Sequence, residues 1–156
     1  MKTKLLYCIA FTGSLMISCE KEEAVFYRFD ESSFTAKQKK WTEQNIQNYK
    51  FDQYYMSSAT GPVAETIIVQ NGTAYSSNED QSVLIGTISD VYARVLNDFN
   101  QGKNNPQRPI YGITVAVKYH TDYHFPEEIK FSTSYKEDIV GGAWYELKIS
   151  DFEILE

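Results

Sequence analysis

The segment TISDVYARVLNDF, residues 87–99, gives the clearest indication of the fold. Its apolar side chains recur at spacings of three and four, as on one face of an amphipathic helix: Ile88, Val91, Tyr92, Val95, Leu96 and Phe99. Thr87 followed three residues later by Asp90 is typical of a helix start, and Gly102 favours the helix end. The pattern predicts a helix that packs its apolar face across a β-sheet.

The segments on both sides of this helix alternate with the period of two that is typical of half-buried strands. Upstream, residues 49–55 alternate, and the pair Asn71-Gly72 between two β-rich runs predicts a tight hairpin. Downstream, three more segments predict strands, with a change of phase near residues 150–151 that indicates a bulge: 113–119, 129–135 and 145–149.

An earlier helix is predicted over residues 36–48. Thr35 and Gln38 have the spacing of a capping box, and Phe34 is placed for a hydrophobic staple. We therefore expect an α+β fold, two helices packed on a mainly antiparallel sheet in the order helix, three strands, helix, three strands. The order suggests a degenerate tandem repeat, although any two helix-plus-meander units would look somewhat alike. Residues 35–156 are predicted to form a single domain.

The N-terminal residues have the parts of a bacterial lipoprotein signal. Lys2 and Lys4 precede an apolar run too short to span about 30 Å of hydrocarbon as a helix, which predicts a signal peptide over residues 1–18. The run ends in LMISC, residues 15–19, and resembles a lipobox, in which the cysteine receives acyl chains such as palmitate. The alternative is an ordinary signal peptide with Cys19 a free thiol. Cleavage before Cys19 would leave it without a disulfide partner, which favours lipidation.

Residues 19–34 are predicted to be a lipidated tether. The run Glu20-Lys21-Glu22-Glu23 resembles the lipoprotein export signal of the Bacteroidetes, which directs proteins to the exterior of the outer membrane. A merely solvated tether on the periplasmic face is the alternative. Loss of residues 1–18 would remove two lysines and no acidic residue, which leaves thirteen basic and twenty-one acidic residues. That balance argues against a nucleic-acid partner, because binding to phosphates needs clustered cations.

The domain also resembles a known family. The segments WTEQNIQNYKFDQYY, IIVQNG, GTISDVYARV, VAVKYHTDYHFPEEIKFS and LKISDFEI are similar to those of the bacterial family named domain of unknown function 6174, over residues 41–154. Tyr119 and Pro126 keep the frame of its inter-strand turn, whereas His120 and Phe125 replace the usual aspartate and tyrosine. The resemblance implies an α+β fold and lipid-anchored relatives, and it implies no activity.

One group of residues could carry chemistry. On an extended strand, His120, Asp122 and His124 would share one face and could ligate zinc. The alternative is that residues 119–126 form a hairpin connection whose polar side chains are solvated. The sequence shows no nucleophile elbow, zinc-protease motif or P-loop. It therefore predicts no cofactor and no catalytic residue.

We expect a lipid-anchored, non-catalytic binding module at the outer membrane, facing the exterior. Its partners would be the membrane, through lipid on Cys19, and a protein or glycan that contacts exposed aromatic side chains. Candidates for that contact are Tyr54, Tyr55, Trp144 and Tyr145. The alternative function is a metal-dependent hydrolase of cell-surface polymers that uses His120, Asp122 and His124.

Overall fold

The computed structural model describes residues 24–77, 86–104, 109–136 and 143–156. Within them, two helices accompany one sheet of seven strands in the order β1-β5-β6-β7-β2-β3-β4. All neighbouring strands are antiparallel except β1 and β5, which are parallel. The α+β class and the mainly antiparallel sheet are confirmed. The elements are β1 (Phe26–Arg28), α1 (Glu31–Glu43), β2 (Tyr49–Ser57), β3 (Val63–Gln70), β4 (Thr73–Ser76), α2 (Ile88–Lys103), β5 (Ile110–Tyr119), β6 (Pro126–Tyr135) and β7 (Trp144–Ile154).

The predicted element order is wrong at its beginning, because a strand precedes the first helix. β1 lies in the segment that we assigned to the tether, and it pairs with residues 112–114 of β5 at the edge of the sheet. A three-residue strand has too little periodicity to be detected locally, and its pairing depends on a strand far along the chain. The predicted domain limit at residue 35 falls inside α1.

The first helix also begins earlier than predicted. Asp30 is its N-cap, and the carboxylate of Asp30 accepts a hydrogen bond of 2.9 Å from the backbone N–H of Ser33. This bond holds the pKa of Asp30 below its ordinary value, with a further contribution from the Ser32 hydroxyl. Phe34 is therefore not a staple outside the helix but a fully buried residue within its first turns.

The second helix follows the prediction closely. Thr87 and Asp90 form a reciprocal capping box, and the side chains that face the sheet are buried. The backbone N–H of Ile88 also donates to the hydroxyl of Tyr49 on β2, at 3.1 Å. The helix continues one residue beyond the predicted stop at Gly102 and ends at Lys103. Its apolar stripe thus forms the centre of the core, as expected from the sequence.

Both predicted irregularities of the sheet are present. Asn71 and Gly72 join β3 to β4 with φ values of 50° and 75°, the left-handed conformation that a two-residue hairpin turn requires. In β7, Asp151 has a φ of 51°, and two residues oppose Phe51 of β2 where the register shifts. This bulge turns the last residues of β7 so that Phe152 packs against the core.

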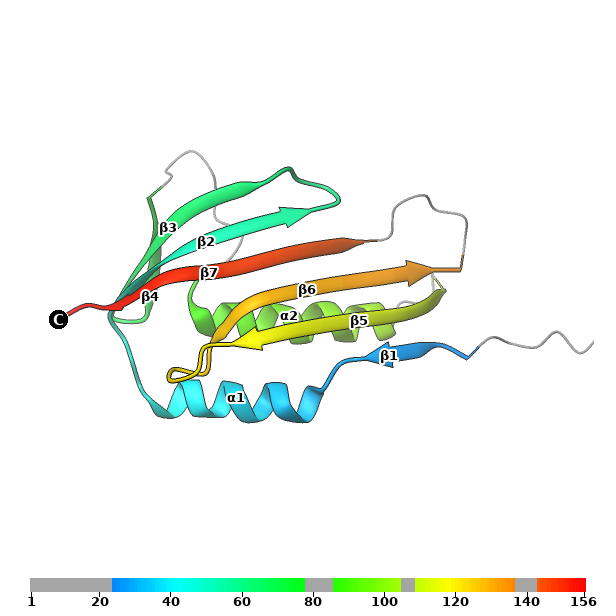
Figure 1. Cartoon of the computed structure of the whole chain (residues 1–156), viewed down its shortest axis with the longest axis horizontal. Helices are drawn as coiled ribbons and strands as arrows, with labels where there is room; N and C mark the ends of the chain where they lie inside the picture. Colours follow the sequence, from blue (N-terminus) through cyan, green and yellow to red (C-terminus); the bar gives the residue numbers. More distant parts are fainter. Residues whose placement is uncertain (1–23, 78–85, 105–108, 137–142) are drawn as a thin grey trace, which may run out of the picture.

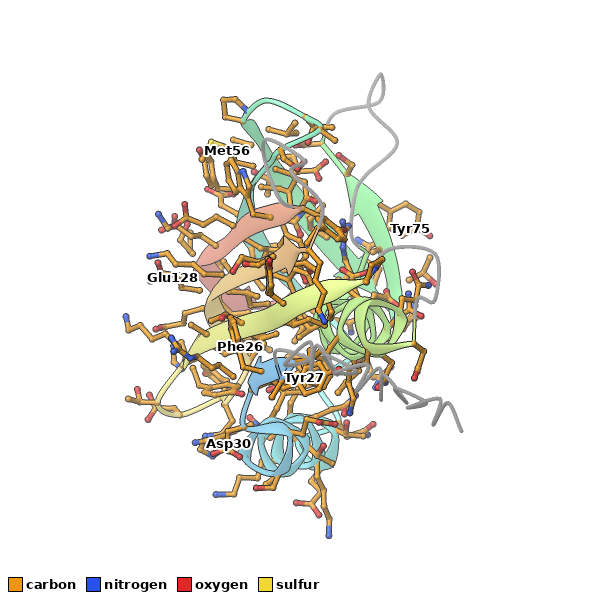
Figure 2. All side chains as sticks on the ribbon, turned by 90° about the vertical axis from the view of Figure 1, so that its right-hand side faces the viewer. Phe26, Tyr27, Asp30, Met56, Tyr75 and Glu128 are labelled. Carbon is orange, nitrogen blue, oxygen red and sulfur yellow. The ribbon has the colours of Figure 1, made fainter. Side chains whose placement is uncertain are left out.

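The helices cover one face of the sheet and leave the other open. Figure 1 shows α2 behind β5 and β6, with α1 beside the β1 edge. The ring of Phe34 on α1 packs edge-on against Tyr92 of α2, with centroids 5.0 Å apart. In the end view of Figure 2, Met56 and Glu128 lie on the side of the sheet away from α2. We call this side, which carries Tyr54, Met56, Lys118, Glu128, Lys130, Trp144, Glu146 and Lys148, the open face.

Candidate functional site

The residues proposed as metal ligands lie in the connection between β5 and β6. Residues 121–123 form a turn, which is closed by hydrogen bonds from the His120 N–H to the Phe125 carbonyl and from the His124 N–H to the His120 carbonyl. The Nδ1 atom of His120 accepts from the backbone N–H groups of Asp122 and Tyr123, each at 3.2 Å. One of the two ring nitrogens of His120 is therefore occupied with holding the turn.

His124 does not complete a ligand set. It has a φ of 65°, and its Nδ1 atom lies 3.4 Å from the ammonium of Lys37 on α1. Desolvation lowers the pKa of His124, and the nearby charges of Lys37 and Lys40 lower it further. No group of three His, Cys, Asp or Glu side chains among the described residues is arranged to hold a metal ion. The extended strand on which the zinc hypothesis depended is absent, and the hairpin interpretation is confirmed.

Two of the four aromatic contact candidates are core residues instead. Tyr55 and Tyr145 are 4% and 7% exposed, and their rings stack at 5.7 Å on the helical side of the sheet. Arg94 of α2 lies over both rings and donates to the Tyr55 hydroxyl at 2.9 Å. Burial raises the pKa of Tyr145, and the charge of Asp98 raises it further. Of the four residues, Tyr54 and Trp144 remain accessible, and both lie on the open face.

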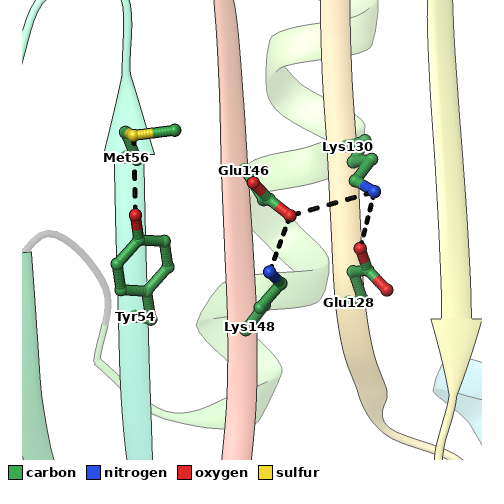
Figure 3. A network of polar contacts seen from close by, with 6 residues as sticks. All are labelled: Tyr54, Met56, Glu128, Lys130, Glu146 and Lys148. Carbon is green, nitrogen blue, oxygen red and sulfur yellow. Dashed lines mark hydrogen bonds and ion pairs between the residues drawn. The ribbon is translucent and has the colours of Figure 1, made fainter. Parts of the chain in front are cut away.

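The open face carries an ordered network of charges (Figure 3). Lys130 lies 2.8 Å from Glu128 and 3.9 Å from Glu146, and Lys148 lies 3.0 Å from Glu146. The side-chain hydrogen bond to Lys130 lowers the pKa of Glu128, and the reciprocal bond raises the pKa of Lys130. The pKa of Lys148 is raised in the same way by Glu146. These shifts widen the range of pH over which Glu128, Lys130 and Lys148 stay charged.

This network follows from the register of two strands. Residues 128–130 are Glu-Ile-Lys and residues 146–148 are Glu-Leu-Lys. In the antiparallel pair, Glu128 lies opposite Lys148 and Lys130 lies opposite Glu146, while the apolar residues between them face the core. This network is not among the sites predicted from the sequence, although the repeated order of acidic, apolar and basic residues is a signal for it.

Aromatic and sulfur-containing side chains border the network on β2. The hydroxyl of Tyr54 lies 3.5 Å from the sulfur of Met56, and the ammonium of Lys148 lies 5.8 Å from the centre of the Tyr54 ring. Tyr54 pairs with Lys148 and Met56 with Glu146 across the β2–β7 ladder. The open face thus combines one apolar, polarizable row with two charged rows.

Two hollows lie at opposite ends of the sheet. A groove of about 550 Å³ lies on the open face near the β7 bulge, and its walls include Tyr54, Lys118, His120, Glu128, Lys148 and Asp151. A cavity of about 330 Å³ lies near the end of α2, and its walls include Asp98, Gln101, Phe131, Thr133, Tyr135 and Tyr145. The groove is continuous with the charged network, because it shares Glu128 and Lys148 with it. We therefore take the open face and its groove as the candidate binding site.

Comparisons with protein-family models, with curated proteins and with solved structures found no match. Within the described part of the chain, neither helix has the length and apolar character needed to cross a bilayer.

Proposed function

We propose that this protein is a lipid-anchored module of the cell envelope that binds a protein partner through the open face of its sheet. The observation that carries the proposal is the one-sided covering of the sheet. The face without helices holds charges of both signs at fixed positions, beside the accessible side chains of Tyr54, Met56 and Trp144. Tyr, Trp and Met are common contact residues at protein interfaces.

The charge pattern favours a protein over a glycan as the partner. A surface with the reversed order of charges would align with Glu128, Lys130, Glu146 and Lys148, and such complementarity sets the register and the choice of partner. A neutral glycan has no charges to match that order. The hydrolase alternative lacks an observation in its favour, because the histidines support the hairpin turn.

The test reverses the four charges and keeps each ion pair of the network. In the quadruple variant Glu128→Lys/Lys130→Glu/Glu146→Lys/Lys148→Glu, every pair still joins opposite charges, but the pattern presented outward is reversed. A photo-crosslinking residue at Met56 should capture a defined envelope protein in the wild type and lose it in the quadruple variant. The same crosslinker at Ser32, an exposed residue of α1, is the control. Equal capture at both positions, or capture unaffected by the exchange, would contradict the proposal.

The anchor is proposed from the sequence, since Cys19 lies outside the described residues. Lipid on Cys19 would hold the domain at the outer membrane, and the acidic run at 20–23 supports an outward orientation. Cys19→Ser should release the protein from the membrane fraction. Protease accessibility on intact cells distinguishes the exterior from the periplasmic face.

The relation to domain of unknown function 6174 and the internal duplication are part of the same proposal. The order of elements supports a duplication, because α1 is followed by the meander β2–β4 and α2 by the meander β5–β7. The two meanders join edge to edge through the β2–β7 pair. The family is tested by superposing residues 41–154 on a crystal structure of a member of that family. The repeat is tested by superposing α1 and β2–β4 on α2 and β5–β7. A different strand order in either superposition would contradict the corresponding part of the proposal.

A further inference from the structure

Exposed apolar side chains gather where the described chain begins, at the β1 edge of the sheet. Val25, Phe26 and Tyr27 are 38%, 42% and 45% exposed, and Tyr111 of the adjacent strand β5 is 40% exposed. β1 has a neighbour on one side only, so these side chains lie at an open border of the sheet. Figure 2 looks onto this end of the molecule and shows Phe26 and Tyr27 at β1.

The two rings are held in place at this edge. Phe26 lies opposite Gly112, and its ring occupies the space that a side chain there would need, with ring carbons 2.5–2.6 Å from the position of a Cβ atom. Tyr27 lies opposite Ile113, on the helical side, and contacts the ring of Phe99 edge-on at 5.9 Å. Each ring is therefore fixed by the domain and still presents a large part of its surface to the outside.

Cations accompany the rings. The guanidinium of Arg28 lies 5.3 Å from the centre of the Phe26 ring, and the ammonium of Lys103 lies 5.4 Å from that of Tyr27. Lys103 also lies 3.9 Å from the carboxylate of Glu31. Aromatic rings beside Arg and Lys are typical of protein surfaces at the headgroup level of a bilayer. There the rings enter the interface between water and hydrocarbon, and the cations are attracted to lipid phosphates.

The length of chain before this edge points to the same surface. Ala24 is five positions along the chain from Cys19, and five extended residues span at most about 18 Å. This step rests on the proposed lipidation of Cys19. If the acyl chains are in the bilayer, the β1 edge cannot be far from the headgroups, and its exposed apolar surface lies within their reach.

We propose that the β1 edge, made of Val25, Phe26, Tyr27 and Tyr111 with Arg28 and Lys103, rests on the membrane surface and orients the domain. The partner of this surface is the phospholipid headgroup region. The β5–β6 turn lies at the other end of the sheet (Figure 1) and points away from the bilayer in this arrangement. The groove beside that turn is then presented to the surroundings, while a freely tumbling domain would present all its faces equally.

The test uses the full-length lipidated protein in vesicles of phosphatidylcholine and phosphatidylglycerol that contain headgroup spin-labelled lipid. Acylated Cys19 cannot react with a thiol dye, so Val25→Cys supplies the dye site in the processed chain. We expect the spin label to quench a dye at position 25 at least about twofold more than a dye at Tyr75→Cys. Tyr75 is 55% exposed on β4, at the opposite border of the sheet, and serves as the matched control.

The outcomes separate this inference from the proposed anchor. Wild-type protein that sediments with vesicles but shows equal quenching at positions 25 and 75 would overturn the membrane contact and leave the anchor intact. Wild-type protein that does not sediment would overturn both. In the variant Phe26→Ser/Tyr27→Ser we expect sedimentation to remain and the quenching at position 25 to fall below that of the wild type, to the level that the short tether alone causes. Circular dichroism checks that this variant is folded.

Discussion

The two faces of the sheet are built from the same strands but differ in what their side chains do. On the helical face, Phe51, Ile67, Ile129 and Leu147 are at most 1% exposed and belong to one core with the buried side chains of α1 and α2. On the open face, the alternate residues form ion pairs that remain in contact with water. Buried apolar contacts contribute most of the stability, whereas exposed ion pairs contribute little. The helical face therefore contributes most of the stability, and the open face is the one to which we assign the proposed recognition.

The largest expected effect comes from a cavity on the helical face. Phe34→Ala removes a fully buried ring that contacts Phe29, Tyr92 and Tyr119, and we expect a loss of about 3–5 kcal/mol in the free energy of unfolding. The measurement is equilibrium denaturation in urea. Tyr54→Ala on the open face is the matched control, and a comparable loss there would show that both faces determine stability.

The next largest effect is expected at Gly112, where β1 joins the sheet. In Gly112→Ala, the new methyl group collides with the ring of Phe26, and we expect a loss of about 1–3 kcal/mol. The same substitution in a Phe26→Ala background should be neutral or stabilising, because alanine is favoured over glycine in a strand once the ring is gone. A double-mutant cycle by urea denaturation measures this. Additive effects would mean that the ring does not determine the cost.

Glu146→Gln tests the open face itself. Glu146 contacts both Lys130 and Lys148, at 3.9 Å and 3.0 Å. Since all three side chains are accessible to water, we expect a smaller change in the melting temperature than for Gly112→Ala, together with weaker capture of the partner. Melting curves at low and high salt provide the measurement. A large loss of stability without any effect on binding would reverse the roles assigned to the two faces.

The smallest expected effect concerns pH and the β5–β6 turn. The folded state holds the pKa of His124 below its unfolded value, mainly by desolvation and then by Lys37 and Lys40. As the pH falls through about 6.5, His124 is protonated in the unfolded chain before it is protonated in the folded protein. The free energy of unfolding therefore decreases below that pH. Asparagine tolerates the φ of 65° at this position. In His124→Asn, we expect the melting temperature to change less between about pH 7.5 and about pH 5.5 than in the wild type. An unchanged pH profile in the variant would exclude His124 as the source.

Much of the fold could be predicted because it is encoded locally. The hairpin at Asn71-Gly72 depends on two residues that accept positive φ, and α2 depends on its cap at Thr87 and its own apolar stripe. The candidate site could be predicted only in part. Tyr54 and Trp144 were expected contact residues, but Tyr55 and Tyr145 belong to the alternation that faces the core.

The order of residues along the chain is enough to tell which side chains of each strand and helix face the same way, because the periods of 2.0 and 3.6 are properties of the local backbone. Tertiary structure alone decided that β1 pairs with β5, that the histidines form a turn beside Lys37, and that Glu128 and Lys130 meet Lys148 and Glu146. These contacts join residues far apart in the chain. They depend on strand order and register, which the packing of the whole sheet against its helices fixes and which no local period encodes.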